Sequence, residues 1–218
     1  MIEGLKRSFE LILDTVMPLR ARSARTKARK AEDIPLTPTE HELLGVRITT
    51  LMDYRNEAVQ DLIRALKYDR SRHAAKIAAE LLADYLREEI ASIQTFSTAR
   101  ILLAPVPLHT SRQRERGFNQ IELVLESLPQ EFRDGTLSRL SPSTLLRTRA
   151  TNPQTKLSRA ERIKNVIGAF ECPDVNVLRN AHVFLIDDVT TTGATLLHAG
   201  KPLEKAGAKV SLIALARA

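Results

Sequence analysis

The 218-residue chain has a single cysteine, no tryptophan and only eight glycines. Because Cys172 stands alone, an internal disulfide and a zinc site of the CxxC type are excluded. The glycines form neither a G-x-G-x-x-G nor a G-x-x-x-x-G-K-[ST] pattern, so the sequence supports neither a dinucleotide-binding fold nor a P-loop ATPase.

Long hydrophobic runs are also missing. No apolar stretch approaches the roughly 18 to 20 residues that a membrane-spanning helix needs. The N-terminus carries Glu3, Glu10 and Asp14 where a signal peptide would be uncharged. We therefore expect a cytoplasmic protein without a membrane span.

The positive charge is concentrated in two stretches. The formal net charge is +7, and residues 20–30 and 139–164 each carry six more basic than acidic side chains, so the remainder is mildly acidic. Such patches indicate anionic ligands at particular places rather than a surface that coats nucleic acid uniformly. For residues 20–30 a solvated tether is the favoured interpretation, and a nucleic-acid-binding arm is the alternative.

Hydrophobic periodicity predicts an α/β fold. Apolar residues at helical spacing predict an amphipathic helix over residues 2–17, and proline and charge predict a linker after it. Short, wholly apolar runs predict strands that are buried on both faces. Further helices are expected over residues 56–68, 71–90, 119–128, 158–166 and 193–206, and strands over 101–104, 144–147, 183–186 and 210–214.

The most informative segment is V-F-L-I-D-D-V-T-T-T-G-A-T at 183–195. Asp187 and Asp188 follow a buried strand, and ligands of open α/β sheets bind at the carboxyl ends of strands. A loop that is rich in hydroxyl groups and opens a helix is suited to one phosphate. The carboxylates would accept hydrogen bonds from ribose hydroxyls or hold Mg²⁺. A helix cap with solvent-facing acids is the alternative. A cap alone would not require two acids, four threonines and a glycine at the end of a buried strand.

This segment resembles the motif with which type I phosphoribosyltransferases bind phosphoribosyl pyrophosphate (PRPP). The resemblance implies a type I phosphoribosyltransferase-like fold, a parallel sheet flanked by helices. It also implies that Asp187 and Asp188 hold the ribose hydroxyls, that Mg²⁺ binds at these two acids, partly through water, and that the loop holds the 5-phosphate. The loop residues are Thr190, Thr191, Thr192, Gly193, Ala194 and Thr195.

Further pieces resemble the ComF family of competence proteins. They are A-L-K-Y at 65–68, A-P-V-P-L-H and R-x-R-x-R-G-F-N-Q within 104–120, and Q-T-K-L with R-x-x-N within 154–165. The resemblance implies a phosphoribosyltransferase-type domain over 46–218, preceded over 1–45 by a short helix and a basic linker. Family members commonly begin with a four-cysteine zinc module, whereas this chain has no cysteine before Cys172, so zinc is not expected.

The remaining site residues are expected in two loops that follow predicted strands. By the same resemblance, Val106, Pro107, Leu108 and His109 occupy the position of the loop whose backbone amides meet pyrophosphate. Arg112 and Arg116 follow in the same polar segment, and on physical grounds they are suited to stabilise the departing pyrophosphate, because guanidinium groups bind phosphate oxygens bidentately. A solvated arginine stretch is the alternative. Residues 147–165 fall where type I enzymes have a loop that closes over PRPP and excludes water.

Two functions follow as expectations. The first is a Mg²⁺-dependent phosphoribosyltransferase, a glycosyltransferase that transfers a pentosyl group from PRPP to an acceptor that the sequence does not identify. Asp187, Asp188, Arg112 and Arg116 are its expected catalytic residues. The second is a non-catalytic competence factor that binds single-stranded DNA or proteins of the competence machinery. An aromatic content of 4% argues against a surface for base stacking, and the two functions are compatible.

Overall fold

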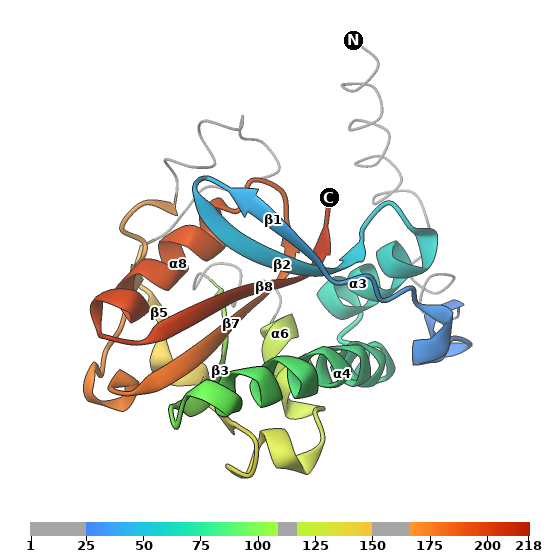
Figure 1. Cartoon of the computed structure of the whole chain (residues 1–218). Coiled ribbons are helices and arrows are strands. Elements are labelled where there is room, and N and C mark those ends of the chain that lie inside the picture. The colour runs from blue at the N-terminus through green and yellow to red at the C-terminus, as the bar shows by residue number, and fades with distance from the viewer. Residues whose placement is uncertain (1–24, 109–116, 150–165) are drawn as a thin grey trace.

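The computed structural model describes residues 25–108, 117–149 and 166–218. Within them, six strands form one twisted sheet in the order β1-β2-β8-β7-β3-β4. All neighbouring pairs are parallel except β1 and β2, which are antiparallel (Figure 1). The strands are β1 (Thr39–Leu43), β2 (Val46–Asp53), β3 (Arg100–Pro105), β4 (Arg139–Leu140), β7 (Ala181–Thr190) and β8 (Lys209–Arg217).

Helices cover both faces of this sheet (Figure 1). One hydrophobic cluster joins a face of the sheet to α3 (Glu57–Tyr68), α4 (Arg72–Phe96) and α6 (Gln120–Glu126). A second cluster joins the opposite face to α8 (Ala194–Lys205) and to the two-stranded ribbon of β5 (Leu146–Arg147) and β6 (Phe170–Glu171). Short 3-10 helices lie at Ala31–Asp33, Gln130–Phe132, Pro142–Thr144 and Asn176–Leu178. The predicted α/β fold with a parallel sheet flanked by helices is confirmed.

The two helices before β3 begin at capping residues. The Asn56 side chain accepts hydrogen bonds from the backbone N–H groups of Ala58 and Val59 at the start of α3. Ser71 accepts one from Ala74 at the start of α4. These bonds satisfy amides that have no partner inside the helix. Helix α4 extends to Phe96, six residues beyond the predicted end.

The β1–β2 hairpin was not among the predicted elements. Its turn consists of Leu44 and Gly45, whose φ angles of 54° and 76° are both left-handed. Two left-handed residues give the tight turn that suits the twist of an antiparallel pair. Asn-Gly or Asp-Gly is the usual sequence for that turn, and Leu-Gly carries no such signal. The exposed charged side chains of Glu40 and Glu42 also make β1 difficult to predict from the sequence.

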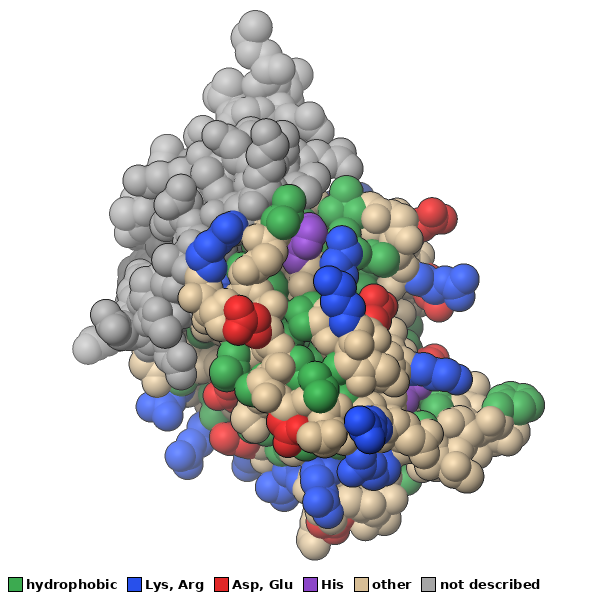
Figure 2. Space-filling model, turned by 90° about the vertical axis from the view of Figure 1, so that its left-hand side faces the viewer, with side chains coloured by type: hydrophobic (Ala, Val, Ile, Leu, Met, Phe, Trp, Pro, Cys, Tyr) green, Lys and Arg blue, Asp and Glu red, His purple; other side chains and the backbone are tan. Residues whose placement is uncertain are grey.

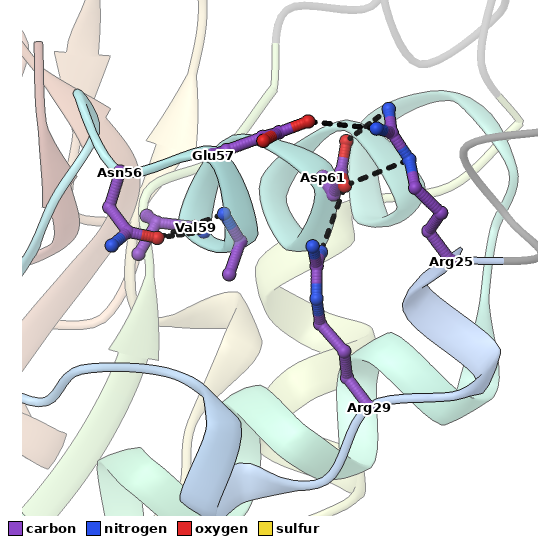
Figure 3. A network of polar contacts seen from close by, with 7 residues as sticks. Arg25, Arg29, Asn56, Glu57, Val59 and Asp61 are labelled. Atoms are coloured by element: carbon purple, nitrogen blue, oxygen red, sulfur yellow. Dashed lines mark hydrogen bonds and ion pairs between the residues drawn. The ribbon is translucent and has the colours of Figure 1, made fainter.

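The described part of the basic stretch packs against α3 rather than extending into solvent (Figure 3). The Arg25 and Arg29 guanidinium groups lie 3.4 and 2.8 Å from the carboxylate of Asp61, whose side chain is 1% exposed. Arg25 also donates to Glu57 at 2.8 Å. The interpretation of this stretch as a solvated tether is therefore wrong for these residues, because their charges are neutralised by acids of α3.

Two expected helices, over residues 2–17 and 158–166, lie wholly or almost wholly outside the described residues. Among the helices that the structure describes, none is both long enough and apolar enough to cross a membrane.

Candidate functional site

The acidic pair lies inside strand β7 rather than after it, because β7 continues to Thr190. Neighbouring side chains of a strand point to opposite faces of the sheet. Asp187 accordingly lines a pocket with the threonine loop on the α8 side. Asp188 contacts α3 and α6 on the other side. The two carboxylates, which the sequence treats as one unit, therefore have different surroundings.

The Asp187 pocket is formed by the loop that connects β7 to α8. Its lining consists of Asp187, Val189, Thr190, Thr191, Thr192, Gly193, Ala194 and Thr195. Helix α8 begins directly after Gly193, and the Thr192 hydroxyl accepts a hydrogen bond from the Ala194 N–H at 3.3 Å. The positive end of the α8 dipole therefore faces a pocket that is rich in hydroxyl groups, an arrangement that favours a phosphate.

Glycine is required at position 193 for two reasons. Its φ of 79° lies in the left-handed region, which side chains with a Cβ rarely adopt. A Cβ there would also stand 2.7 Å from Ile48 Cδ1 and 2.9 Å from Leu43 Cβ, both in the hairpin. The threonine loop is thus packed directly against β1 and β2, which fixes its position.

Asp188 is held by two side chains that the sequence analysis did not assign to the site. The Lys67 ammonium, from the last turn of α3, lies 3.2 Å from Asp188 Oδ2. The Gln120 amide, at the start of α6, donates a hydrogen bond to the same oxygen. Asp188 is buried, and the Lys67 ammonium supplies the opposite charge beside its carboxyl group.

The surroundings raise the pKa values of both Asp187 and Lys67. Burial, together with the charge of Asp188, raises the pKa of Asp187 to about 7, although Lys67 and Arg147 oppose the rise. Burial is the largest single influence on Lys67 and would lower its pKa, but Asp188, Tyr54 and Asp187 together outweigh burial, so the pKa is raised. Lys67 therefore remains charged, and Asp187 titrates near neutral pH.

Among the predicted basic residues that the structure describes, Arg147 influences Asp187. It lies in β5 and stacks over the Phe170 ring, with its guanidinium carbon 5.2 Å from the ring centre. Its charge lowers the pKa of Asp187. His109, Arg112 and Arg116 lie outside the described residues, as do residues 150–165 of the expected closing loop.

The expected pyrophosphate loop is described as far as Leu108. The Val106 N–H donates to the carbonyl of Ile186 at 2.8 Å, which joins this residue to β7. The Val106 carbonyl in turn accepts from the Asn119 side chain at 3.2 Å. Pro107 has no N–H, so within the described part of this loop the amide available to a ligand is that of Leu108.

Of the two acids, Asp187 is better suited than Asp188 to hold Mg²⁺. Mg²⁺ is usually held by one or two carboxylates together with water and substrate phosphates. Asp187 lines the pocket, so its carboxylate fits this role. At Asp188 the Lys67 ammonium already supplies a positive charge. Within the described residues no group of three or more His, Cys, Asp or Glu side chains is arranged to hold a metal ion by protein ligands alone.

Comparison with known proteins identifies relatives over most of the chain. No family model matches the sequence. Competence protein F of Haemophilus influenzae is 31% identical over 164 residues, which cover 74% of this chain and 69% of that protein. The DNA utilization protein YhgH of Escherichia coli K12 is 32% identical over 167 residues, covering 74% and 67%.

The chain belongs to the ComF/YhgH family. The competence protein ComFC of Streptococcus pneumoniae is a further relative, 30% identical over 168 residues, which cover 77% of this chain and 66% of that protein. The chain thus spans about two thirds of the length of these ComF/YhgH relatives. The predicted family membership is confirmed.

Two solved structures are similar to this ComF/YhgH protein. A phosphoribosyltransferase from Corynebacterium diphtheriae has a TM-score of 0.35 and 16% identity, and the match covers 88% of this chain and 80% of that one. An orotate phosphoribosyltransferase from Mycobacterium tuberculosis has a TM-score of 0.34 and 11% identity, with 88% and 81% coverage.

The sequence pieces that resemble ComF proteins supply the two side chains missed at the site. Lys67 lies in A-L-K-Y, and Gln120 ends R-G-F-N-Q. Neither A-L-K-Y nor R-G-F-N-Q contains an acidic residue or a glycine motif that would indicate a ligand-binding site. Their meeting at Asp188 depends on α3 and α6 packing on the same face of the sheet.

Proposed function

We propose that this ComF/YhgH protein binds PRPP together with Mg²⁺ and transfers its phosphoribosyl group. The observation that carries the proposal is the pocket in which the Asp187 carboxyl faces a threonine loop at the start of α8. The N-terminus of α8 with its threonine hydroxyls suits a phosphate, and the Asp187 carboxyl group suits hydroxyl groups or a cation. A ribose 5-phosphate carries both kinds of group.

The described residues have distinct roles in this proposal. The hydroxyl and N–H groups of residues 190–195 bind the 5-phosphate, and Asp187 accepts hydrogen bonds from the ribose hydroxyls. Asp187 would also hold Mg²⁺, which neutralises pyrophosphate when bound. Asp188 is a positioning residue: it accepts from Gln120, pairs with Lys67 and holds β7 against α3 and α6.

The transfer requires no side-chain nucleophile. The bond between ribose C1 and the pyrophosphate oxygen breaks, pyrophosphate leaves with the bonding electrons, and an acceptor lone pair forms the new bond to C1. Such a step is accelerated by positioning and by stabilising the charge of the leaving group. Arg112 and Arg116 remain the predicted partners of pyrophosphate.

Calorimetric titration of the full chain with PRPP, with and without Mg²⁺, tests the proposal. We expect Mg²⁺-dependent binding that Asp187→Asn abolishes. Asp84→Asn is the matched control, because Asp84 is an exposed acid of α4 that pairs with Arg87. Binding that is equal in wild type and Asp187→Asn, or no binding with Mg²⁺ present, would overturn it.

We further infer a role in the handling of incoming DNA, because the relatives are named competence and DNA utilization proteins. On the described part of the face in Figure 2, Lys and Arg side chains are interspersed with acidic and hydrophobic ones. Binding of single-stranded DNA should therefore be weak and should fall steeply with salt. Fluorescence anisotropy between low and moderate salt measures this, and an affinity that stays constant would contradict an electrostatic interaction.

A further inference from the structure

A second, larger pocket lies at the same end of the sheet as the threonine loop. It has a volume of about 530 Å³, within the range of small-molecule sites. Its wall includes the carboxyl ends of β2 and β8 and the face of β1 that bears His41. None of its lining residues belongs to the Asp187 pocket.

The two pockets share a backbone connection. Thr190, which begins the threonine loop, pairs in register with Arg217 of β8. The Ala218 N–H donates to the Thr190 carbonyl at 3.1 Å. Arg217 and Ala218 line the second pocket, so the two pockets lie at the ends of neighbouring strands.

The defining contact of the second pocket is an arginine oriented by a histidine. Arg217 Nη1 lies 2.6 Å from His41 Nδ1. Because arginine is always a donor, Nδ1 must accept, so the ring is neutral and carries its proton on Nε2. That Nε2–H donates to the Thr50 hydroxyl at 2.9 Å. Burial and the charge of Arg217 also lower the pKa of His41 below its usual range.

The charge of Arg217 is therefore not neutralised by its partner. Among the described residues no carboxylate forms an ion pair with it, whereas the other arginine of the pocket, Arg55, is neutralised by Asp53 at 2.7 Å. The hydroxyls of Thr37, Thr39 and Thr50 add donors to the lining. The lining contains no aromatic ring other than His41, so it offers no surface for stacking a base.

We propose that this pocket binds the anionic group, a carboxylate or a phosphate, of a small co-substrate used beside the phosphoribosyl donor, with Arg217 as the binding residue and His41 as the positioning residue. The co-substrate role rests on the proposed function, whereas anion binding at Arg217 does not. A guanidinium with free donors, fixed in direction by a neutral ring and surrounded by hydroxyls, is suited to a planar or tetrahedral oxyanion.

The His41 ring is a built-in probe of this pocket. The ¹⁵N resonances of protein labelled at histidine, with His41 assigned by His41→Gln, are followed while inorganic phosphate, acetate or chloride is added at constant ionic strength. We expect the His41 signals to shift saturably with phosphate or acetate and not with chloride. The more effective of the two oxyanions identifies the chemistry of the co-substrate.

Two variants make the test specific. Arg217→Gln should weaken the binding read at His41 by about tenfold or more, and Arg217→Lys, which retains the charge, should recover part of it. Arg87→Gln is the control and should bind as wild type does, because Arg87 lies on α4, pairs with Asp84 and Glu131, and does not line the pocket. The proposal is overturned if His41 does not respond to either oxyanion, or if Arg217→Gln responds like wild type.

The same experiment separates this proposal from the proposed function. Anion binding at His41 is measured without PRPP, and PRPP binding is measured by calorimetry on the same Arg217→Gln protein. A wild-type protein that binds the oxyanion but not PRPP would refute the donor site and leave the anion pocket standing. Retained PRPP binding with loss of oxyanion binding supports both. Phosphate binding that stays strong in Arg217→Gln, with His41 unshifted, would place phosphate at the threonine loop and refute the second pocket.

Discussion

The raised pKa of Asp187 means that its carboxylate reduces the stability of the fold at neutral and alkaline pH. The folded pKa of about 7 lies above the value of about 3.9 for an unfolded chain. The folded protein therefore binds this proton more tightly than the unfolded one. Stability is lost progressively as the pH rises from about 4 to about 7 and stays low above that range.

The size of this effect follows from the difference between the two pKa values. Each unit corresponds to about 1.4 kcal/mol, so a shift of about three units is worth at most about 4 kcal/mol. Asp187 is only half-buried and borders an open pocket, and solvent screening reduces the figure to about 2 kcal/mol. That is a large fraction of the stability of an ordinary domain.

Asp187→Asn removes the ionisable group and retains the local geometry. The amide oxygen can still accept the hydrogen bond that Asp187 Oδ1 accepts from the Asp188 N–H at 2.9 Å. At pH 8 we expect the variant to be more stable than wild type by about 2 kcal/mol, and at pH 4 we expect this gain to have nearly vanished. The same variant should lose PRPP binding, as substitutions of strained functional groups often do.

Urea unfolding of both proteins at pH 4, 6 and 8 measures the difference. Asp84→Asn, at an exposed acid, serves as the control and should differ from wild type by less than about 0.5 kcal/mol at each pH. If Asp187→Asn were no more stable than wild type at pH 8, or if its advantage were the same at every pH, the assignment of a strained carboxyl to this position would be refuted.

Three further predictions concern the surroundings of the site. Lys67→Met should raise the pH midpoint of PRPP binding, because the Lys67 charge lowers the pKa of Asp187; an unchanged midpoint in a calorimetric pH series would contradict the contact. Gly193→Ala should lower the free energy of unfolding by about 2–4 kcal/mol, because the backbone there is left-handed and the added Cβ would lie too close to Ile48. If urea unfolding gave wild-type stability, the hairpin would have to move aside without cost. Asp61→Asn should cost about 1–3 kcal/mol, since Arg29 and Arg25 lose a buried partner; a loss that high salt does not reduce would argue against an electrostatic origin.

The elements that the sequence predicts correctly have local signals. Asn56 and Ser71 cap their helices through side-chain bonds to nearby amides, which depend on a few adjacent residues. The apolar runs at β3, β7 and β8 are buried on both faces, and such runs are typical of central parallel strands. The threonine loop is a local feature as well, so its place at the start of α8 follows from the order of residues.

The hairpin and the docked N-terminal stretch lack such signals. The Leu44–Gly45 turn depends on two left-handed residues, of which only Gly45 indicates that conformation in the sequence. Arg25 and Arg29 read as solvated charges because their partner Asp61 lies more than thirty residues away on α3. Charges that are neutralised across such a distance in sequence are not visible in composition.

By itself the sequence determined the α/β class, the segment that carries the acids and the threonine loop, and family membership, because each of these depends on residues close together in the chain. Only the tertiary structure decided which neighbour each acid has. The alternation of β7 turns Asp187 toward the threonine loop and Asp188 toward Lys67 and Gln120. The hairpin, in turn, brings His41 to Arg217. The contacts of Asp188 and of His41 join segments far apart in the chain, and packing of the sheet and helices brings these segments together.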